Sequence, residues 1–133
     1  AGCLRNATSV ASWLATHLQA GRSVAVVAAG ERWGHDDSLR PALEDLLGAG
    51  AILSGLVARG HAGRMSPEAL SAAESFEAAS GSLGQRLQHC VGGRELTDKG
   101  FAADVAVAAA LDASAVVPVL VDGAFAAGEH DDV

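Results

Sequence analysis

Hydrophobic residues follow two patterns along the chain, stripes of helical spacing and short continuous runs. Apolar side chains recur three and four residues apart over residues 9–20, which predicts an amphipathic helix ended by Gly21. The run SVAVVAA at 23–29 has the length and valine content of a strand covered on both faces. A leucine-rich stripe then predicts a helix that is capped by Ser38 or Asp37 and carries Pro41 in its first turn.

The middle of the chain is dominated by helical spacing. Gly48 and Gly50 are expected to end the preceding helix, and a second short helix follows over 51–58. A capping Ser66 followed by Pro67 predicts the start of another helix. The pattern predicts helices over 67–79, 83–90 and 101–111, and a Gly-Gly-Arg loop at 92–94 that turns into a short helix closed by Gly100.

The last apolar run, AVVPVLV at 115–121, predicts a strand. Pro118 lacks a backbone N–H, so this strand is expected at a sheet edge or at a bulge. Asp122-Gly123 is expected to turn the chain. The last eight residues, AAGEHDDV, include four ionisable side chains, which predicts one domain over residues 1–125 and a frayed polar tail over 126–133.

The order of these elements predicts the α/β class, with a layered α/β/α arrangement around a small, mostly parallel sheet. About three strands would accompany about six helices, which is a small sheet for so many helices. We therefore expect half of a larger two-part α/β fold. Its partner would be a missing amino-terminal half or an equivalent chain.

Composition narrows the class of protein. The chain has 133 residues, a net charge of −7 and no basic run, which argues against nucleic-acid binding. No window of 18 apolar residues exists, so neither a membrane span nor a signal peptide is expected. Cys3 and Cys90 are far apart, as expected for buried thiols in a reducing cytoplasm. The five histidines lack the spacing of a usual zinc site.

The loop between the predicted strand at 23–29 and the following helix carries an unusual density of reactive side chains. In an open α/β sheet, ligands bind where a strand end leads through a loop into a helix. Arg40 and Glu44 are four residues apart and could form a surface ion pair. Alternatively, Arg40 lies near a ligand, and Glu44 or Asp45 orients it or binds a metal. The loop holds Glu31, Arg32, His35, Asp36, Asp37, Ser38 and Arg40.

Two other junctions could bind an anion. Arg5 and Asn6 precede the first helix, where free amides and the helix dipole favour negative charge. The alternative is a plain cap by Asn6 or Thr8 beside a solvated arginine. The Gly-Gly-Arg segment that ends at Arg94 could cradle an anion through its amides, or could be a simple turn.

Six motifs occur in one order along the whole chain, and together they resemble the 2-phosphosulfolactate phosphatase family. Members of that family are longer, and this chain is similar to their carboxyl-terminal half. The motifs are GCLRNA at 2–7, AGERWGHDDSLRPALEDLLGAGAIL at 29–53, SPEA at 66–69, GGREL at 92–96, GFAADV at 100–105 and VPVLVDGAF at 117–125.

The resemblance implies an α/β fold and a magnesium-dependent acid phosphatase. Family members release phosphate from (R)-2-phospho-3-sulfolactate on the route to coenzyme M, although homologues in bacteria without evident coenzyme M synthesis can differ in substrate. The site positions that the resemblance implies are Arg5, Asn6, Glu31, Arg32, Ser38, Arg40, Glu44, Asp45, Arg94 and Asp104.

Phosphate ester hydrolysis depends on positioning and on charge neutralisation. Guanidinium groups bind phosphoryl oxygens in bidentate fashion, and Mg²⁺ prefers one or two carboxylates together with water and substrate oxygens. A carboxylate or a metal-bound water would activate the nucleophile. We expect Glu31 and Glu44 to hold Mg²⁺, with Asp45 as the alternative to Glu44. The expected catalytic residues are Glu31, Arg32 and Asp45, and the expected substrate-binding residues are Arg5, Asn6, Ser38, Arg40 and Arg94.

Two other functions compete with this hypothesis. In a non-catalytic anion-binding or assembly domain, the arginines would hold a small anion or pair with acids at an interface, and Asp36 and Asp37 would form a solvated loop. A serine hydrolase is disfavoured because no GxSxG motif occurs. The expected partners are a small phosphorylated substrate and a possible second copy in a homo-oligomer, without nucleic acid or membrane.

Overall fold

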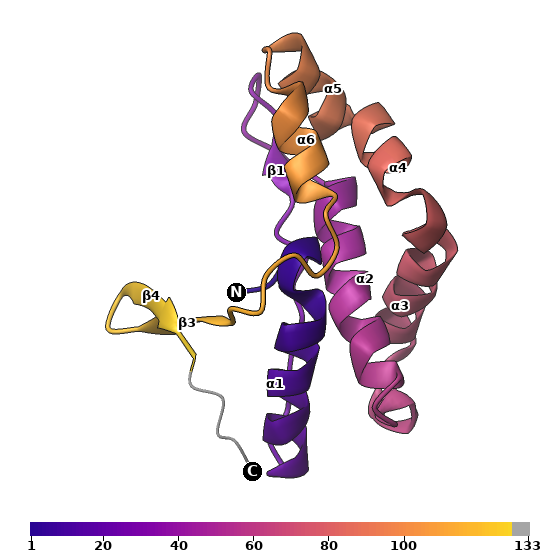
Figure 1. The fold of residues 1–133 in the computed structure, drawn as a ribbon, viewed down its shortest axis with the longest axis vertical. Helices are drawn as coiled ribbons and strands as arrows, with labels where there is room; N and C mark the ends of the chain where they lie inside the picture. The colour runs from indigo at the N-terminus through magenta and orange to yellow at the C-terminus, as the bar shows by residue number, and fades with distance from the viewer. Residues whose placement is uncertain (129–133) are drawn as a thin grey trace.

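Helix α2 (Leu43–Val57) lies at the centre of the molecule. The computed structural model describes residues 1–128. Helix α2 packs between α1 (Ala7–Gln19) on one side and α3 (Pro67–Ala79) on the other (Figure 1). The side chains buried between these helices form the core, among them Val10, Leu47, Ile52, Leu56 and Phe76.

Glycines allow α2 to approach both neighbours. A Cβ at Gly50 would meet the carbonyl oxygen of Ala72 and lie 2.9 Å from Cβ of Phe76, both in α3. A Cβ at Gly55 would lie 2.7 Å from Cβ of Ala11 in α1. Burial against two helices offsets the helix propensity that each glycine loses, about 1 kcal/mol. The predicted break at Gly48 and Gly50 and the separate helix over 51–58 are therefore wrong.

Three shorter helices continue the chain beyond α3. They are α4 (Leu83–His89), α5 (Val91–Asp98) and α6 (Ala102–Ala108), and they lie together at one end of the molecule (Figure 1). Short 3₁₀ turns occupy Leu4–Asn6, Ala62–Arg64 and Ser80–Ser82.

The helix that was predicted over 67–79 is confirmed, including its cap. The hydroxyl oxygen of Ser66 accepts a hydrogen bond from the amide of Ala69, 3.3 Å away, and Pro67 opens the helix. The first helix, in contrast, is not capped by Asn6 or Thr8. The carboxylate of Asp112 accepts from the Thr8 amide at 2.7 Å. A residue more than 100 positions away thus caps α1.

The strands form two separate antiparallel hairpins. β1 (Glu31–Arg32) pairs with β2 (Leu39–Arg40), and β3 (Pro118–Val121) pairs with β4 (Ala124–Ala127). The predicted Asp122-Gly123 turn is confirmed, and both residues have the positive φ that such a two-residue turn requires.

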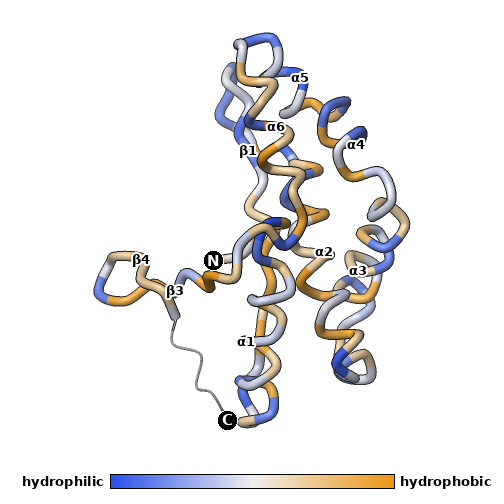
Figure 2. The backbone as a smooth tube through the Cα atoms, viewed as in Figure 1, coloured by the Kyte–Doolittle hydropathy of each residue, from blue (hydrophilic) through white to orange (hydrophobic). Residues whose placement is uncertain are grey.

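The second hairpin reaches into the residues that were expected to form a polar tail. Its strand β4 extends to Ala127, two residues into the expected polar tail at 126–133, and residues 129–133 of that tail lie outside the described residues. The hairpin projects from the helical body, with hydrophobic residues along it (Figure 2). Leu120 and Phe125 are 62% and 64% exposed.

The layered α/β/α fold with a mostly parallel sheet is wrong, because the described chain is mostly helical with two small antiparallel sheets. The reason lies in residues 23–29. This apolar run is not helical, but it pairs with no other strand among residues 1–128, and Val27 is 82% exposed. A strand needs a neighbour to complete its backbone hydrogen bonds, so no central sheet forms here.

Two further expectations can be compared with the fold. Cys3 and Cys90 are both free, but Cys3 is exposed and Cys90 is only partly buried, so the expectation of two buried thiols is wrong. Within the part of the chain that the structure describes, none of the helices combines the length and the apolar character needed to cross a bilayer.

We predict that Gly50→Ala destabilises the fold by about 1–3 kcal/mol, because the added methyl group forces α2 and α3 apart. Urea denaturation followed by circular dichroism measures this change. The matched control is Gly84→Ala in α4, where an added Cβ meets no atom within 4 Å. That control should raise the stability by up to about 1 kcal/mol, since alanine is the better helix former. Equal effects of the two substitutions would contradict the packing role of Gly50.

Candidate functional site

Arg40 is the best anchored charged residue of the loop region. It lies in β2 and is only 8% exposed. Its two terminal nitrogens donate to the two carboxylate oxygens of Glu95 in α5, at 2.9 and 3.2 Å. The guanidinium also lies over the ring of Trp33, 4.9 Å from its centroid. The first hairpin is thereby fixed to α5.

Each partner of this ion pair shifts the pKa of the other. The hydrogen bond from Arg40 lowers the pKa of Glu95, and the hydrogen bond to Glu95 raises the pKa of Arg40. Smaller contributions to the pKa of Arg40 come from the carboxylates of Glu31 and Glu44. The Nε of Arg40 is buried and has no hydrogen-bond partner among the described residues. Arg40 thus lies among three carboxylates, and its Nε–H group is a hydrogen-bond donor without a partner among the described residues.

A cavity of about 550 Å³ opens beside Arg40 between the first hairpin, the start of α2 and α5. We call it the charged cavity. Charged side chains of both signs line it, so it can hold a polar, ionised molecule. These side chains are Glu31, Arg32, Arg40, Glu44, Glu95 and Lys99.

A smaller hollow of about 280 Å³ shares Arg40, Glu44 and Gly92 with the charged cavity and adds Arg94 and Cys90 to its wall. The shared wall depends on a glycine: a Cβ at Gly92 would lie 2.6 Å from a carboxylate oxygen of Glu44. A side chain at position 92 would displace the Glu44 carboxylate from this wall.

The predicted Gly-Gly-Arg loop is wrong, because residues 92–94 lie within α5. The sulfur of Cys90 caps this helix by accepting from the amide of Gly93 at 3.3 Å. The thiol also donates towards a carboxylate oxygen of Glu44 at 3.7 Å. The two glycines therefore serve helix packing, and the cap is already occupied by a side chain of this chain.

The structure brings four of the predicted site residues to the charged cavity, and a fifth, Arg94, to the adjoining hollow. The four are Glu31, Arg32, Arg40 and Glu44. The side chain of Arg32 is 65% exposed and is held by Asp37, whose backbone oxygen accepts from the guanidinium at 2.6 Å and whose exposed carboxylate accepts at 3.3 Å. Arg32 is therefore both positioned and accessible to an anion.

Arg40 and Glu44 do not form the helical pair that their spacing allowed. Helix α2 begins at Leu43, after an N-cap at Ala42, so Arg40 belongs to β2 and not to the helix. The expected cap by Ser38 or Asp37 is wrong for the same reason. Ser38 instead donates its amide and hydroxyl to Asp36, and these hydrogen bonds lower the pKa of Asp36.

Arg5 and Asn6 make structural contacts away from the charged cavity. A guanidinium nitrogen of Arg5 donates to the carbonyl of Val107 at 2.7 Å. The side-chain amide of Asn6 donates to the carbonyl of Val116 at 2.9 Å, and its oxygen accepts from the amide of Cys3 at 2.9 Å. These bonds attach the start of the chain to the segments before and after Asp112.

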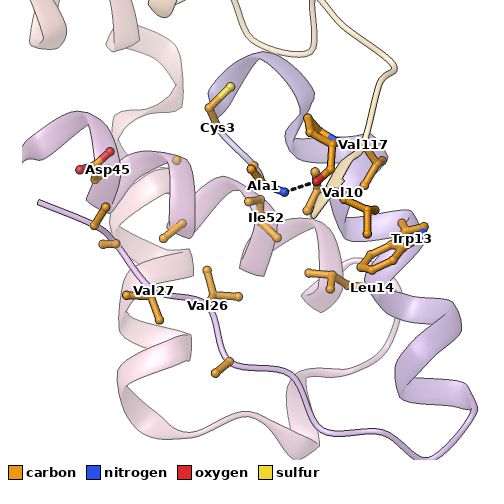
Figure 3. Close-up of a pocket in the computed structure, with 18 of the residues that line it drawn as sticks. Ala1, Cys3, Val10, Trp13, Leu14, Val26, Val27, Asp45, Ile52 and Val117 are labelled. Carbon is orange, nitrogen blue, oxygen red and sulfur yellow. Dashed lines mark hydrogen bonds between the residues drawn. The ribbon is translucent and has the colours of Figure 1, made fainter. Parts of the chain in front are cut away.

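Two predicted acids also lie outside the charged cavity. The carboxylate of Asp45 accepts from the amide of Gly30 at 2.7 Å and lines a separate, apolar cavity (Figure 3). Asp104 lies in the first turn of α6 and is exposed. Asp45 therefore holds the loop that carries Glu31.

Sequence reasoning missed Trp33, Glu95 and Lys99 as parts of the site. Glu95 follows Arg94 in the GGREL motif, so the motif marked its position. The spacing along the chain gave no sign of its role, because the partner Arg40 is 55 residues away.

The donor set can be tested against Mg²⁺. No group of three or more His, Cys, Asp or Glu side chains converges to hold a metal within residues 1–128. Glu31 and Glu44 nevertheless line the same cavity, and Mg²⁺ commonly uses one or two carboxylates with water and substrate oxygens as its other ligands. The residue types at the charged cavity therefore fit this ion.

Comparison with protein-family models places the chain beside a known family. A family model described as 2-phosphosulpholactate phosphatase, another spelling of the family that the motifs resemble, matches residues 1–123. No curated protein and no solved structure matches the chain significantly.

We predict that the Arg40–Glu95 pair stabilises the fold at neutral pH and not in acid. Because the pKa of Glu95 is lowered on folding, its contribution is complete above the ordinary value of 4.5 and is lost as the pH falls through the lowered value. Glu95→Gln should therefore lower the melting temperature at pH 7, and its effect should shrink as the pH falls below 4.5 and through the lowered pKa of Glu95. Glu74→Gln, an exposed position on α3, is the control and should change neither value. A Glu95→Gln effect independent of pH would contradict this role.

Proposed function

Since the chain belongs to the 2-phosphosulpholactate phosphatase family, we propose that its charged cavity takes part in hydrolysing a small anionic phosphomonoester. The observation that carries the proposal is the convergence of Glu31, Arg32, Arg40 and Glu44 on one cavity. These residues come from β1, β2 and the first turn of α2, which are consecutive elements of the chain.

Arg32 is the group best suited to bind the phosphoryl oxygens. Its guanidinium is accessible, and its hydrogen bond to Asp37 limits the orientations that it must lose on binding. Lys99 lines the same cavity and adds a second positive charge. Arg40 is already paired with Glu95, so its main contribution is to hold β2 against α5 and shape the cavity wall.

The carboxylates of the cavity supply the other half of the chemistry. Glu31 or Glu44 accepts a proton from the attacking water or orients that water towards phosphorus. The same two residues would hold the Mg²⁺ that the family implies, which when bound neutralises charge on the transferred phosphoryl group. Asp45 acts as a positioning residue, because its contact is with the Gly30 amide and not with the cavity.

A substrate with two acidic groups suits this arrangement. The charged cavity offers Arg32 and Lys99, and the adjoining hollow offers Arg94. A phosphate in the charged cavity would face Arg32 and Lys99, and a sulfonate or carboxylate in the adjoining hollow would face Arg94. These local cations would attract an anion although the net charge of the chain is −7. This supports a substrate of the 2-phospho-3-sulfolactate type. A place on the route to coenzyme M stays a proposal that rests on the family.

A non-catalytic anion-binding or assembly domain is the alternative. The pairing of Arg40 with Glu95 favours it, because part of the positive charge is neutralised within the protein. Chelation separates the two functions. Phosphatase activity should be lost with EDTA, whereas anion binding by arginines should depend on salt and not on the chelator. The cytoplasmic location and the homo-oligomer expected from the sequence also stay proposals.

We predict that Arg32→Ala lowers kcat/KM for a phosphomonoester at least about tenfold, because it removes a charge-assisted contact to the phosphoryl group. Phosphate release from 2-phosphosulfolactate and from a panel of phosphomonoesters, with and without Mg²⁺, measures this. Arg22→Ala, an exposed arginine outside the cavity, is the control and should leave the rate unchanged.

Two results would contradict the proposal. Equal kinetics of the Arg32→Ala and Arg22→Ala variants would remove Arg32 from the site. Absence of Mg²⁺-dependent phosphate release from every ester, both by this chain and by a longer chain that includes the expected amino-terminal half, would favour the anion-binding alternative.

A further inference from the structure

The segment Ser23–Ala29 leaves its backbone unpaired. Among residues 1–128, none of its amides or carbonyls takes part in a backbone hydrogen bond. Its sequence is rich in valine and alanine, and Val27 is 82% exposed. A stretch of free N–H and C=O groups next to apolar side chains is a template for another strand.

One side of this segment faces a cavity of about 540 Å³, which we call the strand slot (Figure 3). Residues 25–29 form one wall, and residues 117–120, which include the start of β3, form the opposite wall. The side chains of Trp13 and Ile52, from α1 and α2, line it as well. Two stretches of chain thus flank an apolar space with helices alongside.

The first residues of the chain lie at this slot. Ala1, Gly2 and Cys3 line it, and the amino group of Ala1 donates to the carbonyl of Pro118 in β3 (Figure 3). Asn6 fixes this arrangement through its hydrogen bond to the Val116 carbonyl. The start of the chain therefore already forms one hydrogen bond to the backbone of β3 within the slot, through the amino group of Ala1.

We propose that the strand slot is a docking site for an extended apolar polypeptide strand of about five to six residues. The strand approaches from the side of Ala1 and pairs with Ser23–Ala29 along one edge and with β3 along the other. This is recognition by strand addition, in which the backbone provides affinity and small apolar side chains provide the fit.

A polypeptide fits the slot better than a lipid or another apolar ligand. A hydrocarbon chain would cover the apolar walls but would bury the free amides and carbonyls of 23–29 without partners, at a cost of about 1–3 kcal/mol each. A strand satisfies them.

A second copy of the chain fits less well. Its own segment 23–29 is held at both ends, by the bond from the Arg22 amide to the His17 carbonyl and by the bond from the Gly30 amide to Asp45. This segment of a second copy is therefore not free to leave its own molecule and enter the slot of another.

The inference does not rest on the proposed function, but the slot and the charged cavity are connected. Asp45 lines the slot and accepts from the amide of Gly30, which directly precedes Glu31 of the charged cavity. Occupation of the slot would therefore restrain the segment that leads into the cavity.

The test joins a strand to the intact chain. The probe is the peptide Ser-Val-Ala-Val-Val-Ala-Ala, a copy of residues 23–29, fused directly before Ala1. The matched control is Ser-Pro-Ala-Pro-Val-Pro-Ala, which lacks the alternate amide donors. Hydrogen exchange of the amides of residues 24–29 should slow at least about tenfold in the strand fusion relative to the proline fusion.

Two outcomes would overturn the proposal. The first is equal exchange in both fusions. The second is protection that appears in the unfused chain as its concentration rises, together with dimer formation in analytical ultracentrifugation, which would make a second copy the occupant.

A variant checks that the slot itself is the site of protection. Val27→Asp places a charge on the wall of the slot and should abolish the protection in the strand fusion. Because Val27 is 82% exposed, the substitution should leave the melting temperature of the unfused chain nearly unchanged. Full protection in the Val27→Asp strand fusion would show that the added strand binds elsewhere and would overturn the proposal.

Discussion

The close packing of α2 against α1 and α3 is the constraint on which the rest of the structure depends. Gly50 and Gly55 make this packing possible, because without side chains they let the backbone of α2 approach α3 and α1 closely. The first turn of α2 then has a fixed position, and this turn carries both Glu44 and Asp45. Glu44 meets Gly92 of α5 at the charged cavity, whereas Asp45 holds Gly30 beside the strand slot. The first turn of α2 thus forms part of the wall of both the charged cavity and the strand slot.

The charge of the site is balanced within the chain before any ligand binds. The carboxylates of Glu95, Glu31 and Glu44 surround Arg40 and largely neutralise its positive charge. The charge of Arg40 therefore stabilises the structure more than it attracts a ligand. The accessible positive groups are at the rim, where Arg32 is held by its hydrogen bond to Asp37. Guanidinium groups form strong bidentate hydrogen bonds with carboxylates and with phosphates. Arg40 uses this geometry for Glu95, whereas the more exposed Arg32 is better placed for a ligand. The buried pair is best understood as the frame of the cavity.

Local signals in the sequence predicted individual elements correctly but not the fold class. The cap at Ser66-Pro67 and the turn at Asp122-Gly123 were correct because each depends only on neighbouring residues. Long-range contacts caused the errors. Gly50 looks like a helix breaker unless its contact with α3 is known, and the role of Glu95 depends on a partner 55 residues away. Four of the predicted site residues nevertheless share one cavity, since Glu31, Arg32, Arg40 and Glu44 are close in sequence.

The apolar run at 23–29 shows why composition predicts a strand more readily than a sheet. Its valines and alanines favour extended structure, but a sheet also requires a second backbone, which residues 1–128 do not provide at this place. The consequence reaches the charged cavity. Glu31 and Arg32 follow this run directly, and their hairpin is only two residue pairs long. Its position therefore depends on the Asp45–Gly30 bond at one end and the Arg40–Glu95 pair at the other. A strand seated in the slot would add a third restraint at the start of the hairpin, where the chain is otherwise held by a single hydrogen bond to Asp45.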